Sequence, residues 1–251
     1  MSYYVYEEVA RTKKVLAKNT TERNRGIRYY CPNYECDARM FLWNLDGESK
    51  SFFRSSGKPG HAEGCPYGSD NTYSPEKTKE EGFEADEAIS NLMVAVTSKD
   101  GKKVNPKPPK EEESKEAVVP HTIKQIYDMC KVHYCKETFN GQIIGQILLD
   151  TRSSYMYPKG VFGYRIIEAK CMSRLYDNTN IYLETPIDNV RYHLKLHFID
   201  VNLYKEVRNL LYNNTNHVIA IAGKWESSGE YNCFVTEFNS KRQIKVLKRT
   251  I

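Results

Sequence analysis

Three cysteines and one histidine near the N-terminus have the types and spacing to hold a metal ion. Cys31 and Cys36 belong to the stretch CPNYEC, and His61 and Cys65 belong to the stretch HAEGC further on. Three thiolates and an imidazole form a common tetrahedral zinc set, and proline and glycine beside both pairs favour ligand-bearing turns. The pattern predicts one structural zinc per chain, closed by four protein ligands. Unrelated cysteines, or a different fourth ligand, are the alternatives.

A second group of such residues stands in the stretch CKVHYC. It contains Cys130, His133 and Cys135, and His121 lies nearby. The group lacks a firm fourth metal ligand, and buried cysteines are common on amphipathic helices. A further interpretation is that Cys130 acts as a nucleophile with His133 beside it. Whether these residues bind anything is left open by the sequence.

Composition places the chain among globular proteins. Of its 251 residues 40% are hydrophobic and 27% are charged, and 19 are tyrosines. No apolar run reaches the ~20 residues that a membrane span needs, and the N-terminus lacks the apolar core of a signal peptide. We therefore expect a cytoplasmic protein without a membrane partner. In a reducing cytosol seven cysteines favour metal binding over disulfides.

The chain divides at a segment rich in Lys, Glu and Pro. Residues 98–120 contain no aromatic side chain, so they bury too little apolar area to offset the entropy of ordering. We expect a flexible linker or exposed loop there, between a β module with a helix at 1–97 and a second part at 121–251. The second part holds 18 Lys/Arg against 12 Asp/Glu, which favours an anionic partner.

The N-terminal part reads as short aromatic strands separated by polar turns, followed by an amphipathic helix over residues 74–98. Ser74 suits the N-cap and Pro75 the first helical position, and we expect this helix to pack on the N-terminal module. A sheet this small gains from a metal staple.

The second part begins with a helix at 121–134 and a strand at 141–150. It continues with three strands (161–175, 180–187 and 191–199), a helix at 202–214 and two further strands (217–226 and 231–238). This order, β-β-β-α-β-β, predicts a five-stranded barrel of the OB type. The fold class is therefore α+β and mainly β: a small zinc-stapled β module with an amphipathic helix, a linker, and an OB-like barrel.

Two resemblances accompany these patterns. The stretches YYCPNYECDARMFLW and FFRSSGKPGHAEGCPY resemble the N-terminal cysteine-rich module of CoiA-like bacterial competence proteins, although the nuclease domain of that family has no visible counterpart here. The stretch HVIAIAGKWESSGEYNCFVTEFNSKRQIKVL resembles the end of single-stranded-DNA-binding OB proteins. Together they imply a bacterial or mobile-element protein that works near DNA.

OB barrels bind oligonucleotides on the outer face of strands 2 and 3 and on the flanking loops. Alternation along RYHLKLHF places Tyr192, Leu194, Leu196 and Phe198 in the core. The outward residues of both strands, the first loop and the last hairpin give the candidate nucleic-acid-binding set: Arg174, Tyr176, Tyr182, His193, Lys195, His197, Lys224, Trp225 and Tyr231.

No nucleotide-binding or hydrolase motif occurs in the chain, and Asp150, at the end of a predicted strand, is the one carboxylate worth testing for catalysis. The leading hypothesis is a non-enzymatic protein that binds single-stranded nucleic acid, DNA ahead of RNA. A protein-interaction scaffold that uses the same barrel is the first alternative. A metal-dependent nuclease or accessory subunit is the second.

Overall fold

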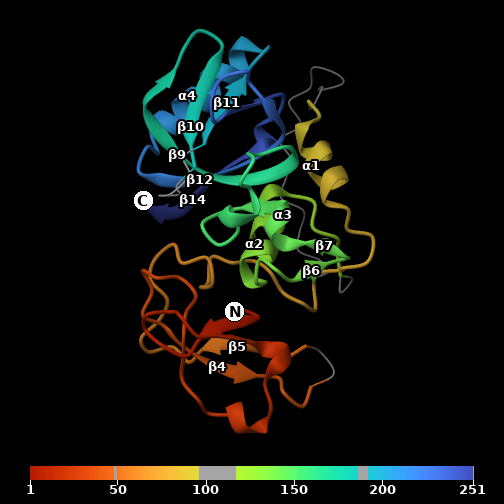
Figure 1. Cartoon of the computed structure of the whole chain (residues 1–251), viewed down its shortest axis with the longest axis vertical. Coiled ribbons are helices and arrows are strands. Elements are labelled where there is room, and N and C mark those ends of the chain that lie inside the picture. Colours follow the sequence, from red (N-terminus) through yellow and green to blue (C-terminus); the bar gives the residue numbers. More distant parts are fainter. Residues whose placement is uncertain (48–49, 96–116, 186–191, 251) are drawn as a thin grey trace, which may run out of the picture.

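The computed structural model describes residues 1–47, 50–95, 117–185 and 192–250. Figure 1 shows an elongated molecule with the N-terminal strands at one end, a helical layer toward the middle and the strands of the C-terminal half at the other end. The architecture is α+β and mainly β, as the sequence predicts. Most of the linker predicted at 98–120, namely residues 98–116, lies outside the described residues. Among the described residues, no helix has the length and apolar character needed to cross a membrane.

The N-terminal module is a five-stranded antiparallel sheet in the order β2-β1-β3-β4-β5. Its strands are β1 (Tyr4–Tyr6), β2 (Lys14–Leu16), β3 (Tyr29–Tyr30), β4 (Arg39–Trp43) and β5 (Phe52–Ser55), with two 3-10 turns at Ala17–Asn19 and Glu22–Asn24. A bridge between Ser2 and Phe53 brings the start of the chain to the free edge of β5. The sheet therefore curls around a small core that includes Tyr29, Met40 and Phe53.

Three helices and short strands form the middle layer. They are α1 (Ala85–Met93), α2 (Ile123–Val132), β6 (Thr138–Phe139), β7 (Gln142–Ile143), α3 (Ile144–Ile147) and β8 (Leu148–Leu149). Helix α2 begins at Thr122, whose hydroxyl accepts from the amide of Gln125 at 3.3 Å, and the Gln125 side chain accepts from the Thr122 amide in return. This capping box fixes the start of the helix.

Three expectations about the middle layer are wrong. Helix α1 starts at Ala85, not near Ser74, because residues 74–77 form a turn closed by the Lys77 amide on the Ser74 carbonyl. It also packs on the long strands of the C-terminal half instead of the N-terminal module, since Ile89 and Leu92 share a core with Ile166 and Val218. The predicted strand at 141–150 is interrupted by the turn of helix α3.

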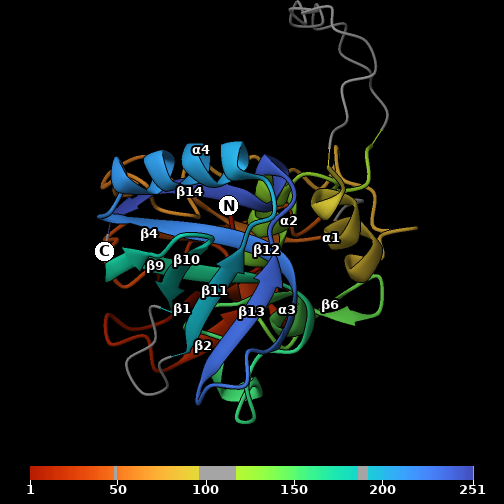
Figure 2. The ribbon, with the colours of Figure 1, turned by 90° about the horizontal axis from the view of Figure 1, so that it is seen from above.

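The C-terminal half contains a closed five-stranded barrel. Its strands are β9 (Gly163–Tyr176), β10 (Asn180–Glu184), β11 (His193–His197), β12 (His217–Ser227) and β13 (Cys233–Glu237), and α4 (Val201–Tyr212) lies between β11 and β12. Pairing runs β9-β10-β11-β13-β12 and returns to β9, with β11 and β13 parallel and the other pairs antiparallel. In Figure 2 β11 and β13 run side by side, and α4 lies along one edge.

The long strands β9 and β12 each contribute side chains to two cores, one on either side of the sheet. Ile167 and Ile219 point into the barrel, whereas Ile166 and Val218 point toward α1 and α2. Strand β14 (Ile244–Thr250), preceded by a 3-10 turn at Lys241–Gln243, extends this sheet beside β12, and β8 extends it beside β9; a further 3-10 turn spans Ser154–Met156. The sheet that contains β9, β12 and β14 therefore packs against helices α1 and α2 of the middle layer.

Candidate functional site

The four predicted metal ligands meet at one point of the N-terminal module. Cys31 follows β3 and Cys36 precedes β4, while His61 and Cys65 lie in the loop after β5. Their ligand atoms all lie within 4.8 Å of one another, and the three sulfurs belong to buried residues. No other cluster of three or more potential ligands occurs in the part of the chain that the structure describes.

The spacing of these atoms fits a tetrahedral ion. Nδ1 of His61 lies 3.6 Å from the sulfur of Cys31, 3.4 Å from that of Cys36 and 3.5 Å from that of Cys65, and the sulfurs of Cys31 and Cys65 are 3.7 Å apart. Metal–sulfur bonds of about 2.3 Å and a metal–nitrogen bond of about 2.0 Å give tetrahedral edges of about 3.8 Å and about 3.5 Å. The cluster is therefore compatible with a metal ion such as zinc.

The electrostatics of the cluster favour a cation. Hydrogen bonds from Cys31 and Cys65 hold the pKa of Cys36 far below its usual range. Burial lowers the pKa of His61, but its contacts with Cys36 and Cys65 outweigh burial and raise that pKa to about 9. The amide of Ala62 also donates to the sulfur of Cys36 at 3.4 Å. Negative charge is thus stabilised at Cys36, whereas burial raises the pKa of the Cys31 thiol well above its usual range.

Arg11 holds the first ligand loop, a role that no pattern in the sequence indicates. Its buried guanidinium donates to the main-chain carbonyls of Cys31, Asn33 and Cys36, each at 2.9 Å, and to that of Val9 at 2.8 Å. One side chain therefore fixes both ends of the stretch CPNYEC. The arginine stands 20 residues before Cys31 in a turn, where neither spacing nor periodicity singles it out.

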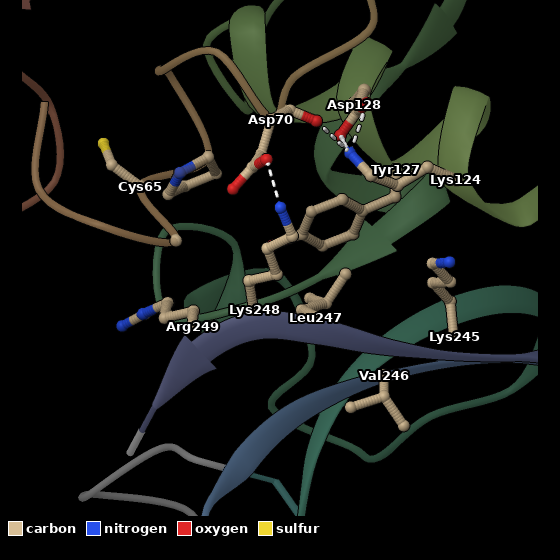
Figure 3. A pocket seen from close by; sticks show the side chains of 12 residues that line it. Cys65, Asp70, Lys124, Tyr127, Asp128, Lys245, Val246, Leu247, Lys248 and Arg249 are labelled. Atoms are coloured by element: carbon tan, nitrogen blue, oxygen red, sulfur yellow. Dashed lines mark hydrogen bonds and ion pairs between the residues drawn. The ribbon is translucent and has the colours of Figure 1, made fainter.

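The second ligand loop contacts the C-terminal half. A Cβ at Gly64, whose φ is +68°, would lie 2.6 Å from the carbonyl oxygen of Lys248 in β14. Arg249 of the same strand pairs with Glu35 at 3.7 Å, and Lys248 pairs with Asp70 at 2.8 Å. Figure 3 shows the pocket of about 160 Å³ at this junction, with the Lys248–Asp70 pair across it. The metal loops are therefore positioned by the strand that extends the barrel sheet.

The second cysteine–histidine group does not assemble into a metal site among the described residues. Cys130 lies in the core between α2 and the long strands, and burial raises the pKa of its thiol. Cys135 donates its S–H to the carbonyl of Arg152 at 3.2 Å. The ring of His133 stacks on Tyr3 with ring centroids 4.6 Å apart. Each residue of the group has a packing role at the junction of the module with α2.

Asp150 belongs to a buried ion network. Its carboxylate accepts from Lys131 and Arg152, each at 2.8 Å, and Lys131 also donates to Glu168 at 2.9 Å. Burial raises the pKa of Asp150, but the charges of Arg152 and Lys131 outweigh it and hold that pKa well below its usual range. Arg152 also donates to Tyr4 at 3.0 Å. The network ties the N-terminal module to α2 and β9, and the Asp150 side chain is fully shielded from solvent.

The outward face of β10 and β11 gathers four of the predicted binding residues. Tyr182 stands opposite Lys195, and the Lys195 ammonium lies 6.0 Å from the centre of the Tyr182 ring. His193 and His197 flank Lys195 on the same side of the strand, whereas Leu194 and Leu196 point into the barrel as predicted. All four outward side chains are partly exposed.

One further aromatic residue, Tyr231, extends this face. It is 92% exposed and lies next to Asn232, whose carbonyl accepts from the amide of His193 at 2.8 Å. Tyr176, at the end of β9, is 46% exposed and lies 5.1 Å from the guanidinium of Arg208 in α4. It stands opposite the inward-facing Ile181, so Tyr176 lies on the side of α4 and not on the outward face of β10 and β11.

Two of the remaining predicted residues, Trp225 and Lys224, do not join this face. Trp225 is fully buried in the barrel core and donates to the carbonyl of Arg165 at 3.2 Å, so its expected role in binding is wrong. Trp225 stands an even number of positions from Ile221 and Ile219 along β12, so all three side chains point into the barrel. The sequence pattern could have shown this. Lys224 is exposed but pairs with Glu226 at 3.3 Å and stands opposite Tyr164, away from β10 and β11. Arg174 lies in β9, and its side chain lies outside the described residues.

The negative charge of Glu184 on this face is offset by a neighbouring lysine. It stands opposite Lys170 of β9, and the two side chains form an ion pair at 3.4 Å. The hydroxyl of Tyr182 donates to Asp177 at 2.8 Å, which raises the pKa of Tyr182 to about 12 and fixes the edge of its ring. Both contacts leave Lys195 without a carboxylate partner among the described residues.

Comparison of the chain with protein-family models, with curated proteins and with solved structures gives no match.

Proposed function

We propose that this protein binds single-stranded nucleic acid without catalysis, on the outward face of β10 and β11. The observation that carries the proposal is the pairing of Tyr182 with Lys195 on that face, with the exposed ring of Tyr231 nearby. Flat rings stack on bases of any sequence, and cations attract the phosphates.

The topology of the barrel supports this proposal. Five strands close in the order β9-β10-β11-β13-β12 with one helix between the third and fourth, which is the arrangement expected of an OB-like barrel. In such barrels the second and third strands carry oligonucleotides, and here these are β10 and β11. Fold alone does not imply function, so the proposal depends on the residues of the face.

We further propose that the cluster of Cys31, Cys36, His61 and Cys65 holds one zinc ion. Three thiolates and one imidazole suit zinc better than the oxygen-seeking cations, and a closed set of four protein ligands is typical of structural sites. The ion would join the loops around β3, β4 and β5, and its role would be to stabilise a module with a small core.

Fluorescence anisotropy with a labelled single-stranded DNA oligonucleotide at low salt tests the binding proposal. We expect binding that weakens as salt rises, and loss of about five-fold or more in affinity for Tyr182→Ala, with Tyr182→Phe close to wild type. Lys195→Gln should lower both affinity and the salt dependence, whereas Lys205→Gln, the same charge change on exposed α4, should change little. Absence of binding up to tens of micromolar protein would reject the proposal.

A further inference from the structure

A second aromatic and basic surface lies on the outward side of the N-terminal sheet. Met40 and Phe53 point inward and are fully buried, so strand alternation places their neighbours on the opposite side. The register pairs Tyr30 with Arg39, Phe41 with Arg54 and Trp43 with Phe52. We call these six residues the outer sheet face: Tyr30, Arg39, Phe41, Trp43, Phe52 and Arg54.

The composition of the outer sheet face is unusual for a solvent-exposed sheet. Four of the six side chains are aromatic, two are arginines and none is acidic. Trp43 is 50% exposed, although large apolar rings are normally buried when no ligand needs them. Beside Trp43 and Phe41 the surface is hollowed by a cavity of about 350 Å³, which Arg25 and Gly26 also line.

Both arginines of the outer sheet face are available to an anion. Arg39 stacks on the ring of Tyr30 at 3.8 Å, and neither Arg39 nor Arg54 forms an ion pair with a carboxylate among the described residues. Arg54 is exposed, whereas Nη1 of Arg39 is buried without a hydrogen-bond acceptor among the described residues. The nearby Asp46 is already bound by Arg25 at 2.5 Å.

We propose that the outer sheet face is a second contact for single-stranded nucleic acid, with bases stacked on Trp43 and Phe41 and phosphates held by Arg54 and Arg39. The ligand class is the one proposed for the barrel, and the inference rests on the proposed function to that extent. Alternating rings and guanidinium groups on an open sheet suit unpaired bases, because every base has a face to stack and every nucleotide a phosphate.

The two surfaces are far apart in the molecule. Strands β4 and β5 lie at one end of the long axis in Figure 1, and β10 and β11 lie at the other end. A short oligonucleotide would therefore occupy either surface alone, while a long strand would engage both and bind more tightly through effective concentration. The metal cluster would then serve binding indirectly, by holding the strands that present the outer sheet face.

Tryptophan fluorescence of the full-length protein separates the two contacts. The chain has two tryptophans, Trp43 at the outer sheet face and Trp225 in the barrel core. We expect oligothymidylate to quench the emission of Trp43 and to protect it from acrylamide. In Trp43→Phe, the remaining emission of buried Trp225 should not respond. Arg54→Gln should weaken the response about five-fold or more, and Lys79→Gln, an exposed lysine elsewhere in the N-terminal part, should leave it unchanged.

The barrel variant Tyr182→Ala/Lys195→Gln provides the matched comparison. If the outer sheet face binds independently, this variant keeps the Trp43 response. Binding detected by anisotropy without any Trp43 response would overturn the inference and leave the barrel proposal standing. A Trp43 response together with wild-type affinity in the barrel variant would support the inference and reject the barrel site. No binding by either measurement would reject both.

Discussion

The guanidinium of Arg11 donates to the main-chain carbonyl of Cys31 across 2.9 Å, and the same group reaches the carbonyl of Cys36. Two candidate metal ligands at opposite ends of one loop are thus positioned by a residue that lies outside the candidate ligand set. Outer contacts of this kind keep ligand atoms in place before an ion binds.

Replacement of Arg11 by alanine should therefore weaken both stability and metal binding. Several charge-assisted hydrogen bonds would be lost from a buried position, for an expected cost of about 2–4 kcal/mol in the free energy of unfolding. Arg11→Lys should retain only part of the wild-type stability, because an ammonium cannot reproduce the planar set of donors of a guanidinium. Urea unfolding and competition with a zinc indicator measure the two effects. Wild-type zinc affinity in Arg11→Ala would contradict this role.

Substitution of a predicted ligand should release the metal and loosen the N-terminal module. We expect about one zinc per wild-type chain by elemental analysis and a clear loss in Cys31→Ser and Cys65→Ser. Hydrogen exchange should rise in β3, β4 and β5, while the barrel strands keep their protection. Cys171→Ser is the matched control, because Cys171 is only partly buried and lies outside the cluster. Equal zinc content in all variants would refute the site.

The buried network predicts a large cost for losing its central cation. Lys131→Met would leave Asp150 and Glu168 with less compensation in a site closed to water, and we expect a loss of about 3 kcal/mol or more. Adding Glu168→Gln should recover part of this loss, because one of the two anions is then neutral. Lys241→Met, at an exposed pair with Glu206, should have no measurable effect. Denaturant unfolding of the four proteins decides between these outcomes.

The metal cluster and the barrel order could be predicted because both depend on local signals. Ligand types at close spacing identify Cys31, Cys36, His61 and Cys65, and strand alternation identifies the core residues Leu194 and Leu196. The start of α1 was not predictable in the same way. Ser74 and Pro75 form a good helix-start signal, but residues 74–77 form a turn and no helix follows it directly. The helix forms only where Ala85, Ile89 and Leu92 pack against the long strands.

The residues that sequence reasoning missed act through contacts distant in the chain. Arg11 holds a loop 20 residues away, and Arg152 donates to Tyr4 across 148 residues. Trp225 was misplaced for a different reason: an aromatic beside Lys224 in a hairpin suggested a ligand contact, while its alternation with Ile221 already placed it inside the barrel. The alternation was therefore the better guide, and the buried position of Trp225 agrees with it.

His133 predicts a pH dependence of stability. Burial lowers its pKa from 6.5 to about 4, reinforced by the charge of Lys50. The unfolded chain binds this proton first as the pH falls, so the full stability is present above about pH 6.5 and declines toward pH 4. The expected loss is about 3 kcal/mol. Urea unfolding of wild type and of His133→Phe, which keeps a ring against Tyr3, should differ in slope over this window. Glu80, Glu137 and Arg152 also face His133, and because both proteins retain them, parallel pH profiles would show that His133 is not the titrating group.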